Sequence, residues 1–331
     1  MMSSAMNIKL AAYIRSEQPR IDAALDSIAA QLPLSARRVA EHILHAGGKR
    51  LRPLLTVLTA RLLGYKADDI FPLAATMEMV HAATLLHDDV IDNANSRRGQ
   101  PAAHHKFGAT RTILAGDALL ARASRIVAGY NDPRLTCCLA AALEETATGQ
   151  ILELDRQDGT RPDLDSYFAV IRGKTAWMLR ACCELGALRA GADEAALAAA
   201  AEYGLQIGMA FQIVDDALDF APAGRTGKPV GGDLREGNLT PPLHLYAQSL
   251  LETERQDFVR SCLGRTLGAE EMDRVVAAVR HGGFDQAARG MADPYLDAAR
   301  AALDQLAADR VTGPEHALLK AVIRYVRDRK L

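Results

Sequence analysis

Two acidic segments with the same spacing of aspartates restrict how this chain can fold. They are Asp-Asp-Val-Ile-Asp at residues 88–92 and Asp-Asp-Ala-Leu-Asp at residues 215–219. On a helix, residues four positions apart point about 40° from each other, so the first and last aspartate of each segment share one face. Two carboxylates roughly 6 Å apart at an effective dielectric of ~20 repel by about 3 kcal/mol. Since the flanking residues are apolar, we expect a cation beside each segment.

The rest of the sequence indicates helices. Apolar residues recur at three- and four-residue steps, as in residues 275–279 and 298–306, which is the period of a helix. Aromatic residues make up 5% of the chain, and β-branched residues seldom alternate with polar ones. We therefore predict an all-α fold, and the lack of a Ser/Gly linker predicts a single domain over residues 1–331. The 221–242 segment, rich in glycine and proline, is expected to be the one long loop.

Composition argues against several classes of protein. The chain has 39 Lys and Arg against 41 Asp and Glu, so no basic excess suggests a nucleic-acid partner. The apolar run 196–214 contains Glu202, Gln206 and Gln212, which favours a buried helix over a membrane span. The five cysteines form no disulfide framework, and residues 1–20 lack the apolar core of a signal peptide. We therefore expect a cytoplasmic protein with buried thiols.

The available ligand types favour magnesium as the missing cation. The D-x-D-x-D-G spacing of an EF-hand is absent, and the Cys and His residues are not spaced for zinc. Carboxylates alone suit Mg²⁺, which keeps part of its water shell and meets substrate phosphates. The alternative is that each acidic segment is a solvated helix face; the apolar flanks and the basic neighbours argue against it.

Basic residues recur beside the acidic segments. They are Lys49, Arg50 and Arg52 before Pro53, Arg97 and Arg98 after residues 88–92, Lys174 beside Thr175, and Lys228 in the 221–242 loop. Pro53 suits the first turn of a helix, and a helix N-terminus attracts anions. We expect Lys174 to open another helix after Gly173. His81 lies about two helical turns before Asp88, on the same face. Together, the acidic and basic residues indicate a diphosphate that binds partly through a metal ion and partly by direct contact with basic side chains.

Together these residues resemble the trans-isoprenyl diphosphate synthase (polyprenyl synthetase) family, in particular its long-chain, octaprenyl diphosphate synthase-like members. The matching stretches are GGKRLRP (47–53), HAATLLHDDVIDNANSRRG (81–99), GKT (173–175), FQIVDDALD (211–219) and GKPVGGDLREGNLT (227–240). The resemblance implies one large helical bundle of the isoprenoid synthase type around a deep central cavity. It also implies a homodimer, with at most peripheral contact with a membrane.

The resemblance also implies roles for individual residues. Isopentenyl diphosphate would be bound by Lys49, Arg52, His81 and Arg98, with Arg50 in the same basic stretch. A cluster of about three Mg²⁺ ions would be held mainly by Asp88, Asp92 and Asp215, with Asp89, Asp216 and Asp219 in supporting positions. The allylic diphosphate would be held by Arg97, Lys174, Gln212 and Lys228. Thr175 and Gln212 would present oxygen atoms to the developing carbocation.

The implied reaction is a head-to-tail (1'-4) condensation of isopentenyl diphosphate with an allylic diphosphate. The allylic C–O bond ionises, the π-bond of isopentenyl diphosphate attacks the cation, and a proton leaves with the diphosphate. Water must be excluded, so the 221–242 loop is expected to act as a lid. The family often has a lysine where this chain has Asn238, which predicts weaker diphosphate binding or an altered loop.

Residues one turn before the first aspartate predict the product length. In the family, bulk at this place stops the growing chain, but here Val80, Ala83 and Thr84 are not aromatic. A long all-trans polyprenyl product of hexaprenyl to decaprenyl size is therefore expected. The alternative is that Ala83 serves tight helix packing and the floor lies near Leu119 and Leu120, with a short farnesyl or geranylgeranyl product.

Three other functions compete with a chain-elongating synthase. A class I terpene cyclase would typically lack the isopentenyl site and the second DDxxD segment, whereas this chain has both. A non-catalytic regulatory subunit commonly loses one aspartate segment, and both are intact here. A helical scaffold does not explain why acidic pairs and basic loops occur together.

Overall fold

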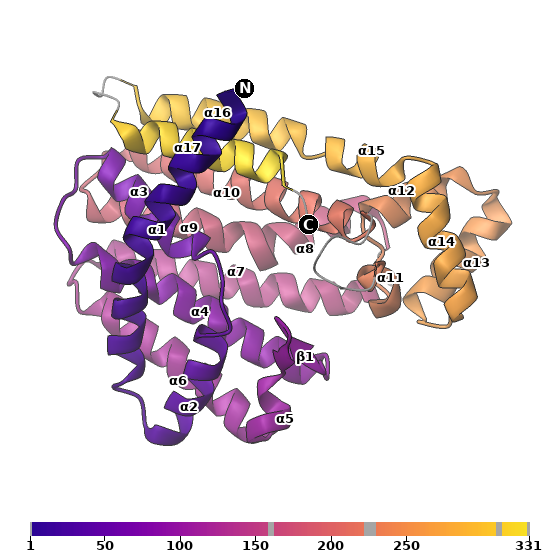
Figure 1. The fold of residues 1–331 in the computed structure, drawn as a ribbon, viewed down its shortest axis with the longest axis horizontal. Helices are drawn as coiled ribbons and strands as arrows, with labels where there is room; N and C mark the ends of the chain where they lie inside the picture. The colour runs from indigo at the N-terminus through magenta and orange to yellow at the C-terminus, as the bar shows by residue number, and fades with distance from the viewer. Residues whose placement is uncertain (1, 158–161, 222–229, 309–312, 330–331) are drawn as a thin grey trace. The chain divides into compact units, whose positions relative to one another are not determined.

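The chain is helical almost throughout its computed structural model, which describes residues 2–157, 162–221, 230–308 and 313–329 (Figure 1). It divides into two compact units. The first comprises Met1–Leu143, Ala181–Ala201 and Gln305–Ala321, and the second comprises Glu144–Arg180, Glu202–Asp304 and Val322–Leu331. The predicted all-α class is confirmed, while the single domain over residues 1–331 stays a prediction.

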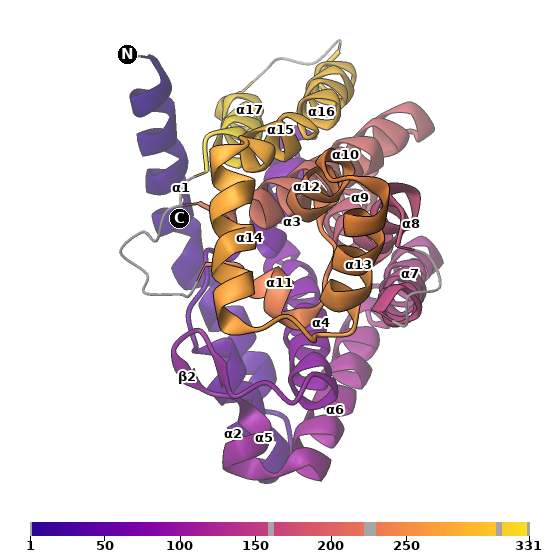
Figure 2. The ribbon, with the colours of Figure 1, turned by 90° about the vertical axis from the view of Figure 1, so that its right-hand side faces the viewer.

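The elements follow in this order. The first are α1 (Met2–Ala29), α2 (Leu34–Leu44), α3 (Leu51–Leu62), α4 (Ile70–Ile91), β1 (Ser96–Arg97), β2 (Gln100–Pro101), α5 (Ala103–Phe107), α6 (Ala109–Ala128) and α7 (Pro133–Gln157). Next come α8 (Leu164–Ile171), the π-helical turn η1 (Arg172–Ala176), α9 (Trp177–Arg189), α10 (Glu194–Leu218), α11 (Gly232–Glu236) and α12 (Pro241–Ser249). The last are α13 (Glu252–Leu263), α14 (Ala269–His281), α15 (Phe284–Gly290), α16 (Asp293–Leu306) and α17 (Pro314–Arg327) (Figure 2).

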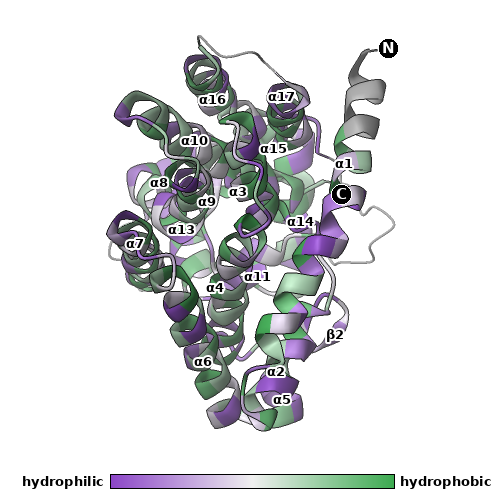
Figure 3. Cartoon of the chain, turned by 90° about the vertical axis from the view of Figure 1, so that its left-hand side faces the viewer, coloured by the Kyte–Doolittle hydropathy of each residue, from purple (hydrophilic) through white to green (hydrophobic). Residues whose placement is uncertain are grey.

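Helix α4 is the core helix of the first unit. It packs against α1, α3 and α6, and Leu73, Ala74, Met77, Val80 and Ala83 are fully buried. A helix that is apolar on all sides is typical of a protein interior. In contrast, α6 is amphipathic and carries both hydrophilic and hydrophobic residues along its length (Figure 3). The first aspartate segment therefore begins within a helix that its neighbours hold firmly.

Small residues let the helices of the second unit approach closely. A Cβ atom at Gly149 would lie 2.3 Å from the backbone nitrogen of Lys174, and one at Gly208 would lie 2.4 Å from the Cα of Ala176. A Cβ at Gly204 would lie 2.5 Å from the carbonyl oxygen of Leu179. Side chains at these positions would therefore push α7 and α10 away from η1 and α9.

The structure corrects three local expectations. Residues 172–176 form η1 between α8 and α9, so Lys174 lies inside a continuous helical stretch and not at a helix start. The described part of the 221–242 loop contains α11. Cys137 is exposed, although the other four cysteines are buried.

Helix α12 begins at Pro241, so Pro241 and Pro242 fall in its first turn. One further expectation is met. Helix α10, which contains the apolar run 196–214, is long and apolar enough to cross a membrane by length and composition, but 67% of its most apolar window is buried within the protein. This burial is typical of a core helix.

We predict that Gly204→Ala destabilises the protein. The added methyl group would clash with the backbone of α9, and overpacking of this kind costs about 1–3 kcal/mol. Urea unfolding would measure the loss. Gly290→Ala is the matched control, because a Cβ there meets nothing within 4 Å. If both variants unfold at the same urea concentration as the wild type, the result would contradict the close packing of α10 against α9 at Gly204.

Candidate active site

In the first unit, the loop between α2 and α3 lies against Arg98. Gly47 and Gly48 have φ angles of +87° and +150°, which L side chains rarely adopt. A Cβ atom on Gly48 would lie 2.9 Å from Nη1 of Arg98. Glycine is therefore required here, both for the backbone conformation and for the close approach of the guanidinium.

Arg50 holds this loop to the body of the first unit. Its Nε donates to Asp22 at 3.0 Å, its Nη1 to Glu78 at 2.9 Å, and its Nη2 to the carbonyl oxygen of Leu44 at 2.6 Å. Two carboxylates and a carbonyl thus satisfy a side chain that is only 7% exposed. These bonds give Arg50 a structural role, and its part in substrate binding stays a prediction.

Three more arginines surround His81. Burial lowers the pKa of His81 well below its usual value, and the positive charges of Arg52, Arg98 and Arg97 lower it further. Burial also lowers the pKa of Arg52 despite the nearby Glu78 carboxylate, and it lowers the pKa of Arg98. His81 is therefore neutral at pH ~7, and this place in the first unit is rich in positive charge.

One donor in this cluster awaits an acceptor. The Nε atom of Arg52 is buried and makes no hydrogen bond to any part of the chain that the structure describes. A buried donor without an acceptor is costly, so a bound anion would stabilise it. Lys49, in the same loop, is exposed.

The three aspartates of the first segment have different surroundings. Asp88 is partly exposed and Asp92 is exposed, and the backbone N–H of Asp92 donates to the carbonyl of Asp88 at 2.8 Å. Helical geometry thus continues through Asp92 and keeps both side chains on one face, as predicted. Asp89 is fully buried, and its Oδ1 accepts from Nε of Arg97 at 2.9 Å. Arg97 therefore neutralises the inward-facing carboxylate and leaves the outer pair to other cations.

The residues predicted to set product length lie on α4. Val80 and Ala83 are fully buried, and the hydroxyl of partly buried Thr84 donates to the carbonyl of His81 at 2.9 Å. Small buried side chains suit either a shaft wall or tight helix packing, so their role as a gate stays a prediction.

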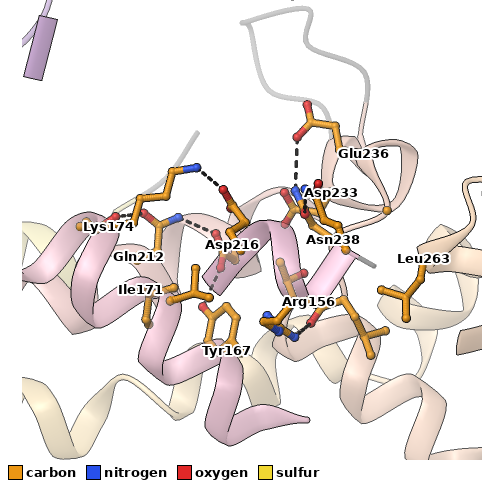
Figure 4. Close-up of a pocket in the computed structure, with 17 residues that line it drawn as sticks. Arg156, Tyr167, Ile171, Lys174, Gln212, Asp216, Asp233, Glu236, Asn238 and Leu263 are labelled. Carbon is orange, nitrogen blue, oxygen red and sulfur yellow. Dashed lines mark hydrogen bonds and ion pairs between the residues drawn. The ribbon is translucent and has the colours of Figure 1, made fainter. Parts of the chain in front are cut away.

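In the second unit, polar residues surround a cavity of about 220 Å³ (Figure 4). Its walls come from α7, α8, η1, α10, α11 and the residues just after α11, with one residue from α13. Four of the predicted site residues line it, namely Lys174, Thr175, Gln212 and Asp216. The fold thus gathers residues from three separate motifs around one space.

Lys174 reaches the cavity from η1. Gly149 and Gly173 allow α7 to touch this turn, and the Lys174 ammonium forms an ion pair with Glu153 of α7. The pair holds the lysine beside the cavity, where a more highly charged anion would compete for it.

The second aspartate segment is divided in the same way as the first. Asp215 is 46% exposed and forms an ion pair with Arg329 at 2.9 Å, and Arg329 also stacks over Phe211. Asp216 is buried; burial raises its pKa to about 7, and hydrogen bonds from Tyr167 and Gln212 oppose the shift. Asp219 accepts a hydrogen bond from the backbone N–H of Asp233 at 3.0 Å.

Sequence reasoning missed several residues of this cavity, among them Glu153, Arg156, Tyr167 and Asp233. Burial raises the pKa of Asp233 well above its usual value, and the nearby Asp216 and Asp219 add to the shift. The sequence signal that could have identified Asp233 is its position directly after Gly231 and Gly232, where the backbone turns.

Two expectations concern the loop after α10. The carbonyl oxygen of the Asn238 side chain accepts from Gln157 at 3.0 Å, so this residue ties the turn after α11 to the end of α7. Lys228 lies outside the described residues, as do the other residues of 222–229 in the proposed lid.

The acidic segments suit a metal that is shared with a ligand. Within residues 2–157, 162–221, 230–308 and 313–329, no group of three or more His, Cys, Asp or Glu side chains is placed to hold a metal ion. The described residues thus make no closed protein cage. They supply carboxylate pairs such as Asp88 and Asp92, and Mg²⁺ is usually bound by one or two carboxylates together with substrate phosphates. This donor set fits Mg²⁺ bound jointly with a diphosphate.

Comparisons with known proteins agree with this chemistry. The polyprenyl synthetase family matches residues 35–279. A heptaprenyl diphosphate synthase component 2 of Geobacillus stearothermophilus is 36% identical over 289 residues, covering 87% of this chain and 88% of that protein. A geranylgeranyl diphosphate synthase of Mycobacterium tuberculosis is 35% identical, covering 84% and 80%. A crystal structure of a polyprenyl synthase of Caulobacter crescentus, complexed with calcium and isoprenyl diphosphate, is similar with a TM-score of 0.90 at 34% identity, covering 98% of each chain. The predicted isoprenoid synthase fold is thereby confirmed.

We predict that Arg97→Met destabilises the protein. The substitution removes the cation that neutralises a fully buried carboxylate, which should lower the free energy of unfolding by about 1–3 kcal/mol. Chemical unfolding would measure the change. Arg111→Met, at an exposed position of α6, is the control. Adding Asp89→Asn should recover part of the loss, and failure to do so would argue against the ion pair as its cause.

The lowered pKa of His81 predicts that the stability of the protein depends on pH. Because its folded pKa lies below the unfolded value of about 6.5, the unfolded chain binds a proton that the folded chain does not. Its contribution is constant above pH ~6.5 and declines as the pH falls below that value. Between about pH 6.5 and 5.5, the wild type should lose about 1 kcal/mol more than His81→Gln in urea unfolding. Equal losses of stability in the wild type and in His81→Gln would show that the pKa of His81 is not lowered in the folded protein.

Proposed function

Because the chain belongs to the polyprenyl synthetase family, we propose that it condenses isopentenyl diphosphate head-to-tail (1'-4) with an allylic diphosphate to give a long-chain all-trans polyprenyl diphosphate. Family membership confirms the enzyme class, a prenyltransferase. The observation that carries the substrate proposal is the group of arginines around neutral His81, in the same unit as the first aspartate segment.

In the first unit, Arg52, Arg98, His81 and Lys49 bind isopentenyl diphosphate. Its diphosphate supplies negative charge beside the guanidinium groups of Arg52 and Arg98, and it gives the buried Nε atom of Arg52 an acceptor. Neutral His81 contributes a hydrogen bond without adding another positive charge. This site holds the substrate that supplies the nucleophilic double bond.

Lys174 and Gln212 of the second unit hold the allylic diphosphate. Lys228, and Arg97 of the first unit, are assigned to the same substrate. Lys174 leaves Glu153 for the more highly charged phosphate and neutralises the leaving group. The C–O bond then breaks with its electron pair on the diphosphate. A new C–C bond forms to isopentenyl diphosphate, and the diphosphate accepts the proton that is lost. Thr175 and Gln212 present oxygen atoms to the carbocation.

Magnesium would be held by Asp88, Asp92 and Asp215, with Asp89, Asp216 and Asp219 in support. When bound, such a dication neutralises negative charge on the leaving diphosphate. The burial of Asp89 and Asp216 suits supporting positions, because protein groups already bond to Oδ1 of Asp89 and to both carboxylate oxygens of Asp216. We propose about three ions, as the family resemblance implies.

The long product follows from the small side chains of α4. Val80, Ala83 and Thr84 place no aromatic ring one or two turns before Asp88. A short product is the second candidate, since one relative is a geranylgeranyl diphosphate synthase. In that case the growing chain would end against other residues.

We further propose a cytoplasmic homodimer with at most peripheral membrane contact. The relative from Geobacillus stearothermophilus is described as one component of its synthase. A partner subunit is therefore a second candidate for the assembly of this chain.

A product assay tests the proposal. The purified chain, given isopentenyl diphosphate, an allylic primer and Mg²⁺, should yield polyprenyl diphosphates of hexaprenyl to decaprenyl size by mass spectrometry. Chelation of divalent ions should abolish turnover. Turnover without isopentenyl diphosphate would indicate a cyclase, no turnover of the chain alone would indicate a dependent subunit, and products of only three or four isoprene units would reject the long-chain proposal.

Ala83→Phe should shorten the products. A ring at this fully buried position of α4 would narrow the space one turn before Asp88. Mass spectrometry of the extracted products measures the shift. Leu120→Phe tests the alternative floor on α6, and an unchanged length in Ala83→Phe would show that Ala83 is not the gate.

A further inference from the structure

A row of hydrogen bonds joins Tyr167 to two residues with proposed catalytic roles (Figure 4). The Tyr167 hydroxyl donates to Oδ2 of Asp216 at 2.6 Å, and Nε2 of Gln212 donates to Oδ1 of the same carboxylate at 2.7 Å. The Thr175 hydroxyl donates to Oε1 of Gln212 at 3.0 Å. All four residues line the same cavity.

This row fixes which end of the Gln212 amide faces each neighbour. The NH₂ group of Gln212 donates to Oδ1 of Asp216, so the nitrogen end of the amide faces the carboxyl group. The amide oxygen then faces Thr175, and the hydroxyl hydrogen of Thr175 is committed to it. The remaining lone pairs of the Thr175 oxygen are thereby left for a positive charge in the cavity. A rotated amide would set its oxygen against the carboxylate and release the hydroxyl hydrogen.

Packing holds Tyr167 itself in place. The residue is 2% exposed, and its ring meets Phe168 edge to face with centroids 5.4 Å apart. The guanidinium of Arg156 lies 5.6 Å from the centroid of the Tyr167 ring, and its Nη2 donates to the carbonyl of Leu239 at 3.1 Å. The hydroxyl therefore has a defined position, as a group that orients others requires.

We propose that Tyr167 is a positioning residue that acts through Asp216. By occupying Oδ2, it keeps the carboxylate turned toward Gln212, which in turn orients the Thr175 hydroxyl toward Gln212 and its lone pairs toward the allylic carbocation. The inference rests on the proposed function, because it assigns a purpose to groups of the allylic site.

Tyr167→Phe tests the proposal, since it removes only the hydroxyl. It should lower kcat about tenfold and leave KM for isopentenyl diphosphate within about twofold, because that substrate is bound by other residues. In a Gln212→Leu background, the same substitution should change kcat by less than about twofold, since the residue through which Tyr167 acts is gone. Tyr246→Phe should behave like the wild type, because the Tyr246 ring packs edge to face against Phe258 and the residue does not line the cavity.

Two results would overturn the proposal. One is a kcat for Tyr167→Phe within about twofold of the wild type, and the other is an equal loss in both backgrounds. If the wild-type chain makes no condensation product, the proposed function is wrong. The row of hydrogen bonds would then be tested by measuring the free energy of unfolding. In that case, non-additive effects of Tyr167→Phe and Gln212→Leu on the free energy of unfolding support the coupling, and additive effects overturn it.

Discussion

The cost of burying like charges is the constraint on which the candidate site depends. In the first unit, burial and neighbouring arginines depress the pKa of His81, and burial depresses the pKa values of Arg52 and Arg98. In the second unit, burial raises the pKa values of Asp216 and Asp233. Each unit thus contains groups that resist their charged state in the protein alone. A bound diphosphate would relieve the first case and divalent cations would relieve the second, so ligand binding would offset the cost of burial.

Several charges that point inward near the candidate site have partners within the protein. Arg97 pairs with buried Asp89, Glu78 pairs with buried Arg50, and Tyr167 and Gln212 donate to buried Asp216. The more exposed members of each acidic segment, Asp88, Asp92 and Asp215, are those that the resemblance assigns to metal. Each acidic segment therefore combines an anchored aspartate with aspartates that can meet a ligand.

Sequence reasoning predicted the all-α class, since apolar residues at helical spacing report burial directly. It also found Lys174 and Asp216 among the charged residues that line the cavity, because charged groups beside apolar runs have few structural explanations. It did not find Tyr167 or Glu153, since a tyrosine or glutamate on a helix carries no sign of its partner. Their roles depend on contacts across α7, α8 and α10, which sequence spacing does not reveal. Arg50 illustrates the converse, since its basic motif gave no hint that Asp22 and Glu78 would hold it.

The π-helical turn η1 was also beyond prediction. Its extra residue per turn arises where Gly149 and Gly173 bring α7 against the backbone, and this contact is visible only in three dimensions. The turn gives the chain an optical reporter as well. The single tryptophan, Trp177, follows it directly, with the Arg180 guanidinium 4.2 Å from its ring centroid. Any rearrangement of Lys174 and Thr175 therefore occurs two or three residues from the one indole in the molecule, so its fluorescence emission can follow ligand capture in real time without any added dye.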